Sequence, residues 1–255
     1  MKVIFFLGTA GCGKSTMVGA ARRWLLENGA NALTANLDPG AERLPYIPDV
    51  DVREYVQLGD VMDTYGLGPN GGMIVSADLV AEDFGDILGE IEDYAPDYLM
   101  VDTPGQLELF VFRASGAFIV RALAKEEIIA AFLIDPFLTQ TASSFVSILL
   151  LSATTELRLG IPVLRVLSKS DMLSSDQLET IEAWTSDPYR LQDDLLKESG
   201  ATKSLSARLC ELLAESEESF SLLKVSSKER LGFEDLYSEI QLTYQGGEDD
   251  IAPEP

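Results

Sequence analysis

The sequence predicts an α/β protein built on a doubly wound, mostly parallel sheet with helices on both faces. Short, almost wholly apolar runs alternate along the chain with longer helical patterns. Runs of this kind are typical of parallel strands covered on both faces, and the helical patterns between them suit β–α–β crossovers. The predicted strands are residues 2–7, 32–37, 97–102, 128–135, 162–168 and 221–226.

Two gaps between the predicted strands are too long for a single crossover, so we expect helical insertions within one domain of residues 1–245. The first insertion, residues 38–96, contains a Pro-rich loop, the Gly-rich segment GLGPNGG (66–72) and an acidic helix around 77–94. The second insertion, residues 172–220, is also helical, and leucines recur in it at the spacing of one packed helix face. These leucines are Leu205, Leu209, Leu212 and Leu213.

The composition limits the class of protein and its partners. A net charge of −23, from 42 acidic and 19 basic residues, repels nucleic acid and anionic membranes, so we expect neither as a partner. Two cysteines predict no disulfide framework, and the absence of histidine excludes histidine-based acid–base catalysis and most zinc sites. The apolar runs are too short for a signal peptide or a membrane span, which favours a cytoplasmic protein. Residues 246–255 are predicted to form an acidic tail.

The segment GTAGCGKS, residues 8–15, follows the first predicted strand and precedes a helix, and it matches the phosphate-binding pattern GxxxxGK[ST]. Its glycines let successive backbone N–H groups turn toward phosphates, and the helix N-terminus adds partial positive charge. Lys14 supplies a cation for the β- and γ-phosphates, and Ser15 offers a hydroxyl to Mg²⁺. The sheet is therefore predicted to be that of a P-loop NTPase. The predicted nucleotide ligands in this loop are Gly11, Cys12, Gly13, Lys14, Ser15 and Thr16, with Cys12 as a small neutral filler.

A metal site is predicted where the strand at 97–102 ends. Asp102 is a carboxylate at the end of a buried strand, near the phosphate loop, and is a candidate Mg²⁺ ligand. Gly105 follows in the turn DTPG, and its N–H is predicted to donate to the γ-phosphate because no side chain blocks its backbone.

The segment SKSD, residues 168–171, follows the fifth predicted strand and indicates a guanine pocket. Asp171 can accept hydrogen bonds from N1–H and from the exocyclic amine of guanine, a pair of donors that adenine lacks. The aliphatic stem of Lys169 would lie along the base, and Ser168 stands where asparagine is commoner in such motifs. Ser227, after the last strand, would offer its N–H to guanine O6.

With these elements in order, the chain resembles the GPN-loop GTPases along nearly its whole length. Gly40 departs from the family pattern, in which alanine is more frequent, and we expect little consequence beyond a looser loop there. The residues that carry the resemblance are Gly68-Pro69-Asn70, GTAGCGKST, NLDPGAE (36–42), DTPGQLE (102–108) and SKSD.

The resemblance implies a constitutive homodimer in which the GPN loop of each subunit, Gly68, Pro69 and Asn70, enters the partner's nucleotide site. Asn70 would then supply a neutral amide donor where other enzymes use a lysine or arginine finger. Gly68, Gly71 and Gly72 would allow close approach to phosphate. The resemblance also implies GTP and GDP as ligands and Mg²⁺ as cofactor, and it points to a protein client in RNA polymerase assembly.

Hydrolysis requires a water molecule in line with the γ-phosphate, and no histidine can orient it. Gln106, directly after the DTPG turn, is the predicted water-positioning residue. Glu108 would face the same side if this segment is extended. Asp38, after the second strand, is predicted to bind Mg²⁺ through water or to act in a switch. The apolar segment LELFVF, with Phe110 and Phe112, predicts a dimer surface beside these residues.

The GTP hydrolase is one of four functions that the sequence leaves open. A metal-insertion GTPase usually carries Cys or His ligands at its dimer interface, whereas this chain has no histidine and only Cys210 outside the phosphate loop. A small-molecule kinase on the same sheet is disfavoured by SKSD and by Asn70. A non-catalytic, nucleotide-gated scaffold is distinguished only by its negligible turnover.

Overall fold

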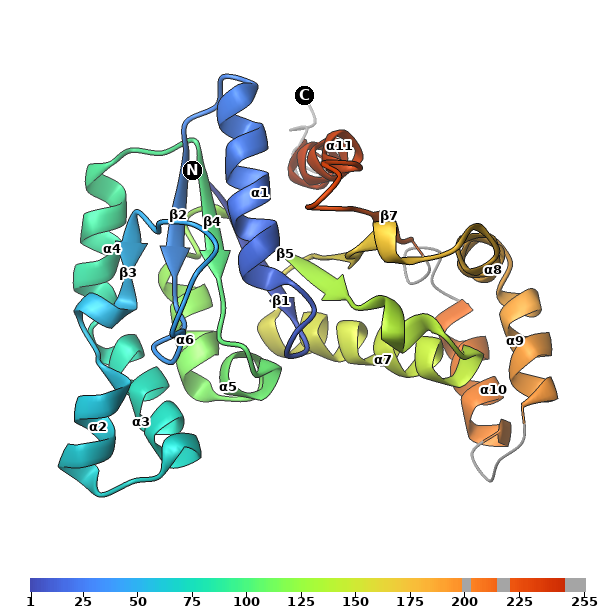
Figure 1. Cartoon of the computed structure of the whole chain (residues 1–255), viewed down its shortest axis with the longest axis horizontal. Coiled ribbons are helices and arrows are strands. Elements are labelled where there is room, and N and C mark those ends of the chain that lie inside the picture. Colours follow the sequence, from blue (N-terminus) through green and yellow to red (C-terminus); the bar gives the residue numbers. More distant parts are fainter. Residues whose placement is uncertain (199–202, 215–220, 246–255) are drawn as a thin grey trace, which may run out of the picture.

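The computed structural model describes residues 1–198, 203–214 and 221–245, which form a wholly parallel sheet of seven strands (Figure 1). Its order is β3-β2-β4-β1-β5-β6-β7, with the strand that precedes the phosphate loop in the centre. The predicted doubly wound α/β sheet is therefore confirmed. The strands are β1 (Lys2–Gly8), β2 (Ala32–Asn36), β3 (Val50–Asp51), β4 (Tyr98–Asp102), β5 (Glu127–Ile134), β6 (Val163–Leu167) and β7 (Leu223–Lys224).

The two edges of the sheet differ from the prediction. Strand β3 lies in the segment that we expected to be a Pro-rich loop, and its two residues are too few for an apolar pattern to reveal it. Strand β7 is shorter than the predicted 221–226, because only Leu223 and Lys224 pair with β6. The helices are α1 (Lys14–Glu27), α2 (Leu58–Tyr65), α3 (Pro69–Glu82), α4 (Phe84–Asp93), α5 (Leu107–Val111), α6 (Ala114–Ala122), α7 (Ala142–Leu159), α8 (Ser175–Ser186), α9 (Pro188–Lys197), α10 (Lys203–Ala214) and α11 (Phe233–Gln245), with 3-10 turns η1 (Val52–Glu54), η2 (Pro136–Thr139) and η3 (Ser170–Met172).

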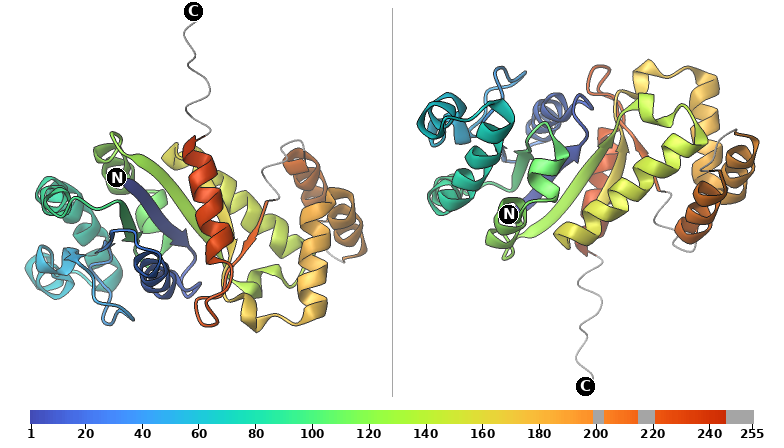
Figure 2. Two further views of the ribbon diagram at one scale, coloured as in Figure 1. Left: turned by 90° about the horizontal axis from the view of Figure 1, so that it is seen from above. Right: turned by 90° about the horizontal axis from the view of Figure 1, so that it is seen from below.

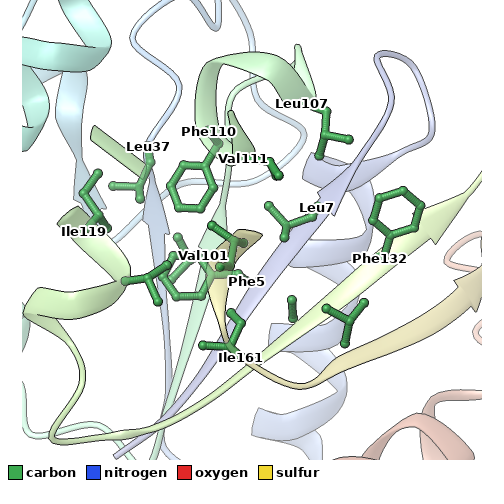
Figure 3. Close-up of a cluster of buried hydrophobic side chains, with 14 of the residues drawn as sticks. Phe5, Leu7, Leu37, Val101, Leu107, Phe110, Val111, Ile119, Phe132 and Ile161 are labelled. Atoms are coloured by element: carbon green, nitrogen blue, oxygen red, sulfur yellow. The ribbon is translucent and has the colours of Figure 1, made fainter. Parts of the chain in front are cut away.

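Helices cover both faces of the sheet because side chains alternate along each strand. Ile4 and Phe6 of β1 point to the face covered by α1 and α11. Phe5 and Leu7 point to the opposite face, where α4, α5, α6 and α7 pack. Figure 2 shows α11 and α7 crossing the sheet on its two sides. In Figure 3, side chains of α5 lie over β1, and the rings of Phe5 and Phe110 are 5.4 Å apart.

The first of the two long segments between predicted strands contains α2, α3 and α4. The prediction of a single acidic helix around 77–94 is wrong, because α3 ends at Glu82 and α4 begins at Phe84. The Gly-rich segment is not an extended loop. Gly66 ends α2 in the left-handed conformation, and α3 begins at Pro69, a position that suits proline. Gly72 is buried against α2, and a Cβ there would lie 2.6 Å from the Met62 Cγ. Its lack of a side chain is thus explained by helix packing.

The second insertion contains α8, α9 and α10, at the opposite end of the molecule from α2–α4 (Figure 1). The predicted leucine stripe is wrong for α10, because Leu205 and Leu212 are 58% and 63% exposed. Ala207 and Cys210 are buried instead, and Leu209 is partly buried. The side chain of Leu213 and the predicted tail at 246–255 lie outside the described residues. Across the ranges given above, no helix is long and apolar enough to cross a bilayer.

The close packing of α6 on α5 predicts a large cost for a side chain at Gly116. A Cβ there would lie 1.9 Å from the Phe110 carbonyl oxygen, so Gly116→Ala should lower the free energy of unfolding by about 1–3 kcal/mol or more. Gly89→Ala is the matched control, because nothing lies within 4 Å of its added Cβ in α4, and it should raise stability by about 0.5–1 kcal/mol. Urea unfolding measures both, and equal effects at the two positions would contradict this packing.

Candidate functional site

The register of the sheet brings the phosphate loop and the DTPG turn together at the carboxyl ends of the strands. Phe6 of β1 pairs with Asp102 of β4, and Gly8 pairs with Leu133 of β5. The Thr103 hydroxyl donates to the Phe6 carbonyl over 2.7 Å, which fixes the turn after β4 against the strand that leads into the phosphate loop. Because all strands run in parallel, their carboxyl ends meet here, where open α/β sheets place their ligands.

The phosphate loop has the backbone that its glycines permit. Gly8, Gly11 and Gly13 have φ values of +143°, +79° and +101°, which residues with a side chain rarely adopt. A Cβ at Gly8 would also lie 2.6 Å from the Leu133 carbonyl oxygen. Cys12 is fully buried, and burial raises the pKa of its thiol. Its side chain fills the space inside the loop, where its sulfur would lie 2.7 Å from a Cβ at Gly8.

Lys14 holds the phosphate loop to the turn after β4. Its Nζ donates to the carbonyl oxygens of Gly8 at 3.0 Å, of Thr9 at 3.3 Å and of Gly105 at 3.1 Å. The side chain is only 6% exposed. A buried ammonium must have its donors satisfied, and these three carbonyls accept them.

The residues predicted to bind Mg²⁺ fit a metal site. Asp102 is 1% exposed; its Oδ2 accepts from the Tyr46 hydroxyl at 3.1 Å, and its Oδ1 is buried without a hydrogen-bond partner. Burial raises the pKa of Asp102 to about 6, although hydrogen bonds from Ser15 and Tyr46 act in the opposite direction. A buried, unpartnered carboxylate oxygen beside a serine hydroxyl suits a hard cation.

No group of three or more Cys, Asp and Glu side chains that could hold a metal occurs within the described part of the chain. Such a group is not required for Mg²⁺, which typically takes one or two protein ligands and completes its shell with water and phosphate oxygens. Ser15 and Asp102 therefore suffice as protein ligands if a nucleotide supplies the rest.

Asp38 accepts the hydrogen bond of the Gly105 N–H. The sequence analysis predicted that this N–H would donate to the γ-phosphate. The Asp38 Oδ2 accepts from the Gly105 N–H at 3.0 Å, and its Oδ1 accepts from the Gly40 N–H at 2.9 Å. The charge of Asp38 also contributes to raising the pKa of Asp102, so the two carboxylates belong to one site.

The segment after the DTPG turn is helical and not extended. Gln106 precedes α5, which begins at Leu107, so the condition under which Glu108 would face the same side as Gln106 is not met. Both side chains are exposed. Phe110 is 3% exposed and belongs to the core, whereas Phe112 is 42% exposed. Of the two aromatic residues expected at a dimer surface, the structure leaves only Phe112 available.

The segment SKSD lies directly beside the phosphate loop. The Ser168 hydroxyl is 2.8 Å from the Cys12 carbonyl oxygen, so serine makes the link between the two loops at this position. The Lys169 Nζ donates to the Gly11 carbonyl at 2.6 Å and pairs with the Asp135 carboxylate at 2.7 Å. The lysine stem consequently crosses the phosphate loop, as a side chain lying along a base would require.

The Asp171 carboxylate is oriented by a serine that the sequence analysis did not select. The Ser226 hydroxyl donates to the Asp171 Oδ1 over 2.6 Å and accepts from the Glu229 N–H at 3.1 Å. Ser226 is fully buried and is in β-bridge contact with Leu231. The neighbouring Ser227 is half-buried, with its hydroxyl 3.4 Å from the Met17 sulfur.

The sequence analysis did not predict three side-chain contacts to the candidate site residues. These are Tyr46 with Asp102, Asp135 with Lys169 and Ser226 with Asp171. Asp135 follows the end of β5, and the rule that selected Asp102 would have selected it too. Ser226 stands next to Ser227, and only the direction of its side chain distinguishes the two. Tyr46 lies in the Pro-rich loop, where no pattern marks it.

The GPN motif is exposed and lies at the N-terminus of α3. Gly68, Pro69 and Asn70 are all exposed, and Figure 1 shows their turn on the side of the sheet where the strands end. Helix α3 nevertheless contacts the loop that follows β2, through Met73. A Cβ at Gly40 would lie 2.4 Å from the Met73 sulfur, so the missing methyl group makes room for this thioether. The looser loop at Gly40 stays a prediction.

Comparison with known proteins shows which family this chain is similar to. A family profile described as "conserved hypothetical ATP binding protein" matches residues 6–246. The chain is 32% identical to a GPN-loop GTPase of Pyrococcus abyssi over 92% of this chain and 94% of that protein. It is 31% identical to GPN-loop GTPase 1 of Dictyostelium discoideum over 95% of this chain and 61% of that protein. The crystal structure of a Pyrococcus abyssi GTPase in its apo form superposes with a TM-score of 0.86 at 31% identity, covering 95% of this chain and 97% of that chain.

Proposed function

The chain belongs to the family of GPN-loop GTPases, and from this premise we propose that it hydrolyses GTP to GDP and phosphate, with Mg²⁺, as a homodimer. The observation that carries the proposal is the convergence of Lys14, Asp102 and Gly105 at one edge of the sheet, with Asp171 next to the phosphate loop. Turnover of GTP measured with Mg²⁺ and with EDTA tests it directly. Added acceptor molecules separate hydrolysis from kinase activity, and single-turnover kinetics exclude or establish a non-catalytic scaffold.

When phosphate binds, the Lys14 ammonium would exchange its carbonyl partners for phosphate oxygens. The Lys14 ammonium, now bound to three carbonyls, would turn to the β- and γ-phosphates, where a cation stabilises the charge that develops during transfer. Mg²⁺ held by Ser15 and Asp102 would neutralise phosphate charge. Gln106 is exposed directly after the turn, where it can orient a water molecule, and Glu108 one position into α5 is the second candidate.

The Asp171 carboxylate favours GTP over the ATP named in the family description. An ionised Asp171 carboxylate can only accept hydrogen bonds and cannot donate them. This suits the two donors of guanine and not the donor–acceptor edge of adenine. Ser226 satisfies one lone pair of Oδ1 and leaves Oδ2 and the remaining lone pairs for the base. Ser168 and Lys169 tie this pocket to the phosphate loop.

The GPN motif is proposed to act in the partner's site. Asn70 is exposed at the first turn of α3, so its amide is free to reach another subunit, and a neutral donor can stabilise a phosphate oxygen in the transition state. Asp38 is proposed to act as a switch residue or to bind Mg²⁺ through water. A role as a switch in assembling a larger protein machine, by resemblance RNA polymerase, is part of the same proposal.

Guanine selectivity should depend on Asp171. Asp171→Asn places an amide where the carboxylate accepts, so GTP affinity should fall about tenfold to a hundredfold while xanthosine triphosphate binds better. Ser226→Ala is the control, because it removes the orienting hydroxyl and keeps the carboxylate; it should weaken GTP binding less and bring no gain for xanthine. Fluorescent nucleotide titrations measure both. An unchanged preference for GTP in Asp171→Asn would refute the assignment of the pocket.

Asn70 should matter for turnover more than for binding. Removing one preorganised donor typically lowers kcat on the order of a hundredfold, whereas Lys14 and the loop backbone still hold the nucleotide. Asn70→Ala should therefore reduce kcat for GTP strongly and change the Kd of a GTP analogue by less than about tenfold. Asp63→Ala, in the neighbouring helix α2 and also exposed, should change neither. A Kd effect as large as the kcat effect would place Asn70 in ground-state binding.

A mixed dimer tests whether the motif acts in the partner's site. A subunit carrying both Lys14→Ala and Asn70→Ala is paired with a wild-type subunit. If the motif acts in trans, the only intact phosphate loop meets a mutated motif, and activity falls to about half that of the Asn70→Ala dimer, which has two such sites. Retention of about half the wild-type activity would mean action within one subunit. Light scattering should first show a dimer with GDP and with a GTP analogue, and a monomer in both states would also refute the shared site.

A further inference from the structure

Asp38 and Gly105 form a contact between the loops that follow two neighbouring strands. Asp38 follows β2 and Gly105 follows β4, and these strands pair along their whole length, with Asn36 opposite Asp102. The Gly105 N–H donates to the Asp38 Oδ2 over 3.0 Å. The acceptor is a carboxylate, so the bond is of the charge-assisted kind, which is stronger than a bond between neutral groups.

The Asp38 carboxylate is held firmly in this orientation. Its second oxygen accepts from the Gly40 N–H at 2.9 Å, and its own N–H donates to the Asn36 Oδ1 at 3.0 Å. Asn36 is fully buried and donates in turn to the Asp51 carboxylate at 2.9 Å. Arg53 braces the other end of the loop by donating to the Ala41 carbonyl at 2.7 Å.

The carbonyl and the N–H of Gly105 are therefore both bound by other residues of the chain. Its carbonyl accepts from Lys14 at 3.1 Å, and its N–H is bound to Asp38. In the proposed function, the Lys14 ammonium and the Gly105 N–H are the groups that a γ-phosphate takes. A carboxylate is an oxygen anion like a terminal phosphate, and two anions are not accommodated on one backbone donor without strong repulsion.

We propose that Asp38 is a built-in stand-in for the γ-phosphate, which a nucleoside triphosphate must displace and a diphosphate need not. Asp38 then determines how strongly the site prefers triphosphate over diphosphate: it weakens binding of GTP and leaves binding of GDP largely unchanged. This inference rests on the proposed function, since it takes a guanine nucleotide as the ligand. It assigns Asp38 to specificity, separately from any contact with Mg²⁺ in the loaded state.

Nucleotide affinity in EDTA tests the inference, because no Mg²⁺ is present for Asp38 to bind. Fluorescent GDP and a non-hydrolysable GTP analogue are titrated into wild-type protein and into Asp38→Ala. The variant should raise the affinity for the GTP analogue by about tenfold relative to GDP, the equivalent of one charge-assisted hydrogen bond. Glu42→Ala removes the same charge from an exposed position of the same loop and should change the ratio less than about twofold. An unchanged or lowered ratio in Asp38→Ala would overturn the proposal.

Asp38→Asn is a control for a change of loop structure in Asp38→Ala. It keeps the shape and an amide oxygen as acceptor but loses the charge, so its affinity ratio should lie between those of wild type and Asp38→Ala. Hydrogen exchange of the Gly105 amide gives a readout without nucleotide: exchange should be slow in the wild type and at least about tenfold faster in Asp38→Ala. Equal exchange in the two proteins contradicts the contact. Failure to bind any guanine nucleotide would instead contradict the proposed function, and the exchange measurement would still decide the fate of the Asp38–Gly105 contact.

Discussion

The buried ammonium of Lys14 is the constraint around which this site is arranged. The chain carries a net charge of −23, yet it buries one cation at the carboxyl edge of its sheet and satisfies it with three backbone carbonyls. Two of these belong to the phosphate loop and one to the turn after β4. A buried charge without partners is very costly, so the Lys14 ammonium holds both elements close together.

The contacts of this centre extend to the helix that carries the GPN motif. Gly105 is bound to Asp38, the Asp38 loop includes Gly40, and Gly40 lies against Met73 of α3. A second connection runs from the segment after α5, where Arg113 pairs with Asp78 of α3 at 2.7 Å. The first turn of α3, with Asn70, thus belongs to a helix that contacts the Asp38 loop of the same chain. Movement of the Asp38 loop or of the segment after α5 would therefore displace α3 and the GPN motif at its N-terminus.

The base pocket owes its geometry to links between loops that are distant in sequence. The Ser168 hydroxyl and the Lys169 ammonium both reach carbonyls of the phosphate loop, and Ser226 fixes the Asp171 carboxylate from the loop after β7. The Ser168 and Ser226 links satisfy hydroxyls that burial would otherwise leave unpaired. The fold therefore holds the loops of the proposed base pocket together.

The sequence by itself determined the class of sheet, five of its seven strands with good boundaries, and the motifs at the strand ends. These features are local: an apolar run specifies a buried strand, GTAGCGKS specifies a backbone that only glycines permit, and parallel strands bring their carboxyl ends together. Only the tertiary structure decided which partner each group finds. The Gly105 N–H is bound to Asp38, the bare Cα of Gly72 faces Met62, Leu205 is exposed, and Glu108 lies on a helix. Each of these outcomes depends on atoms brought close by packing, and a one-dimensional pattern carries no record of those distances.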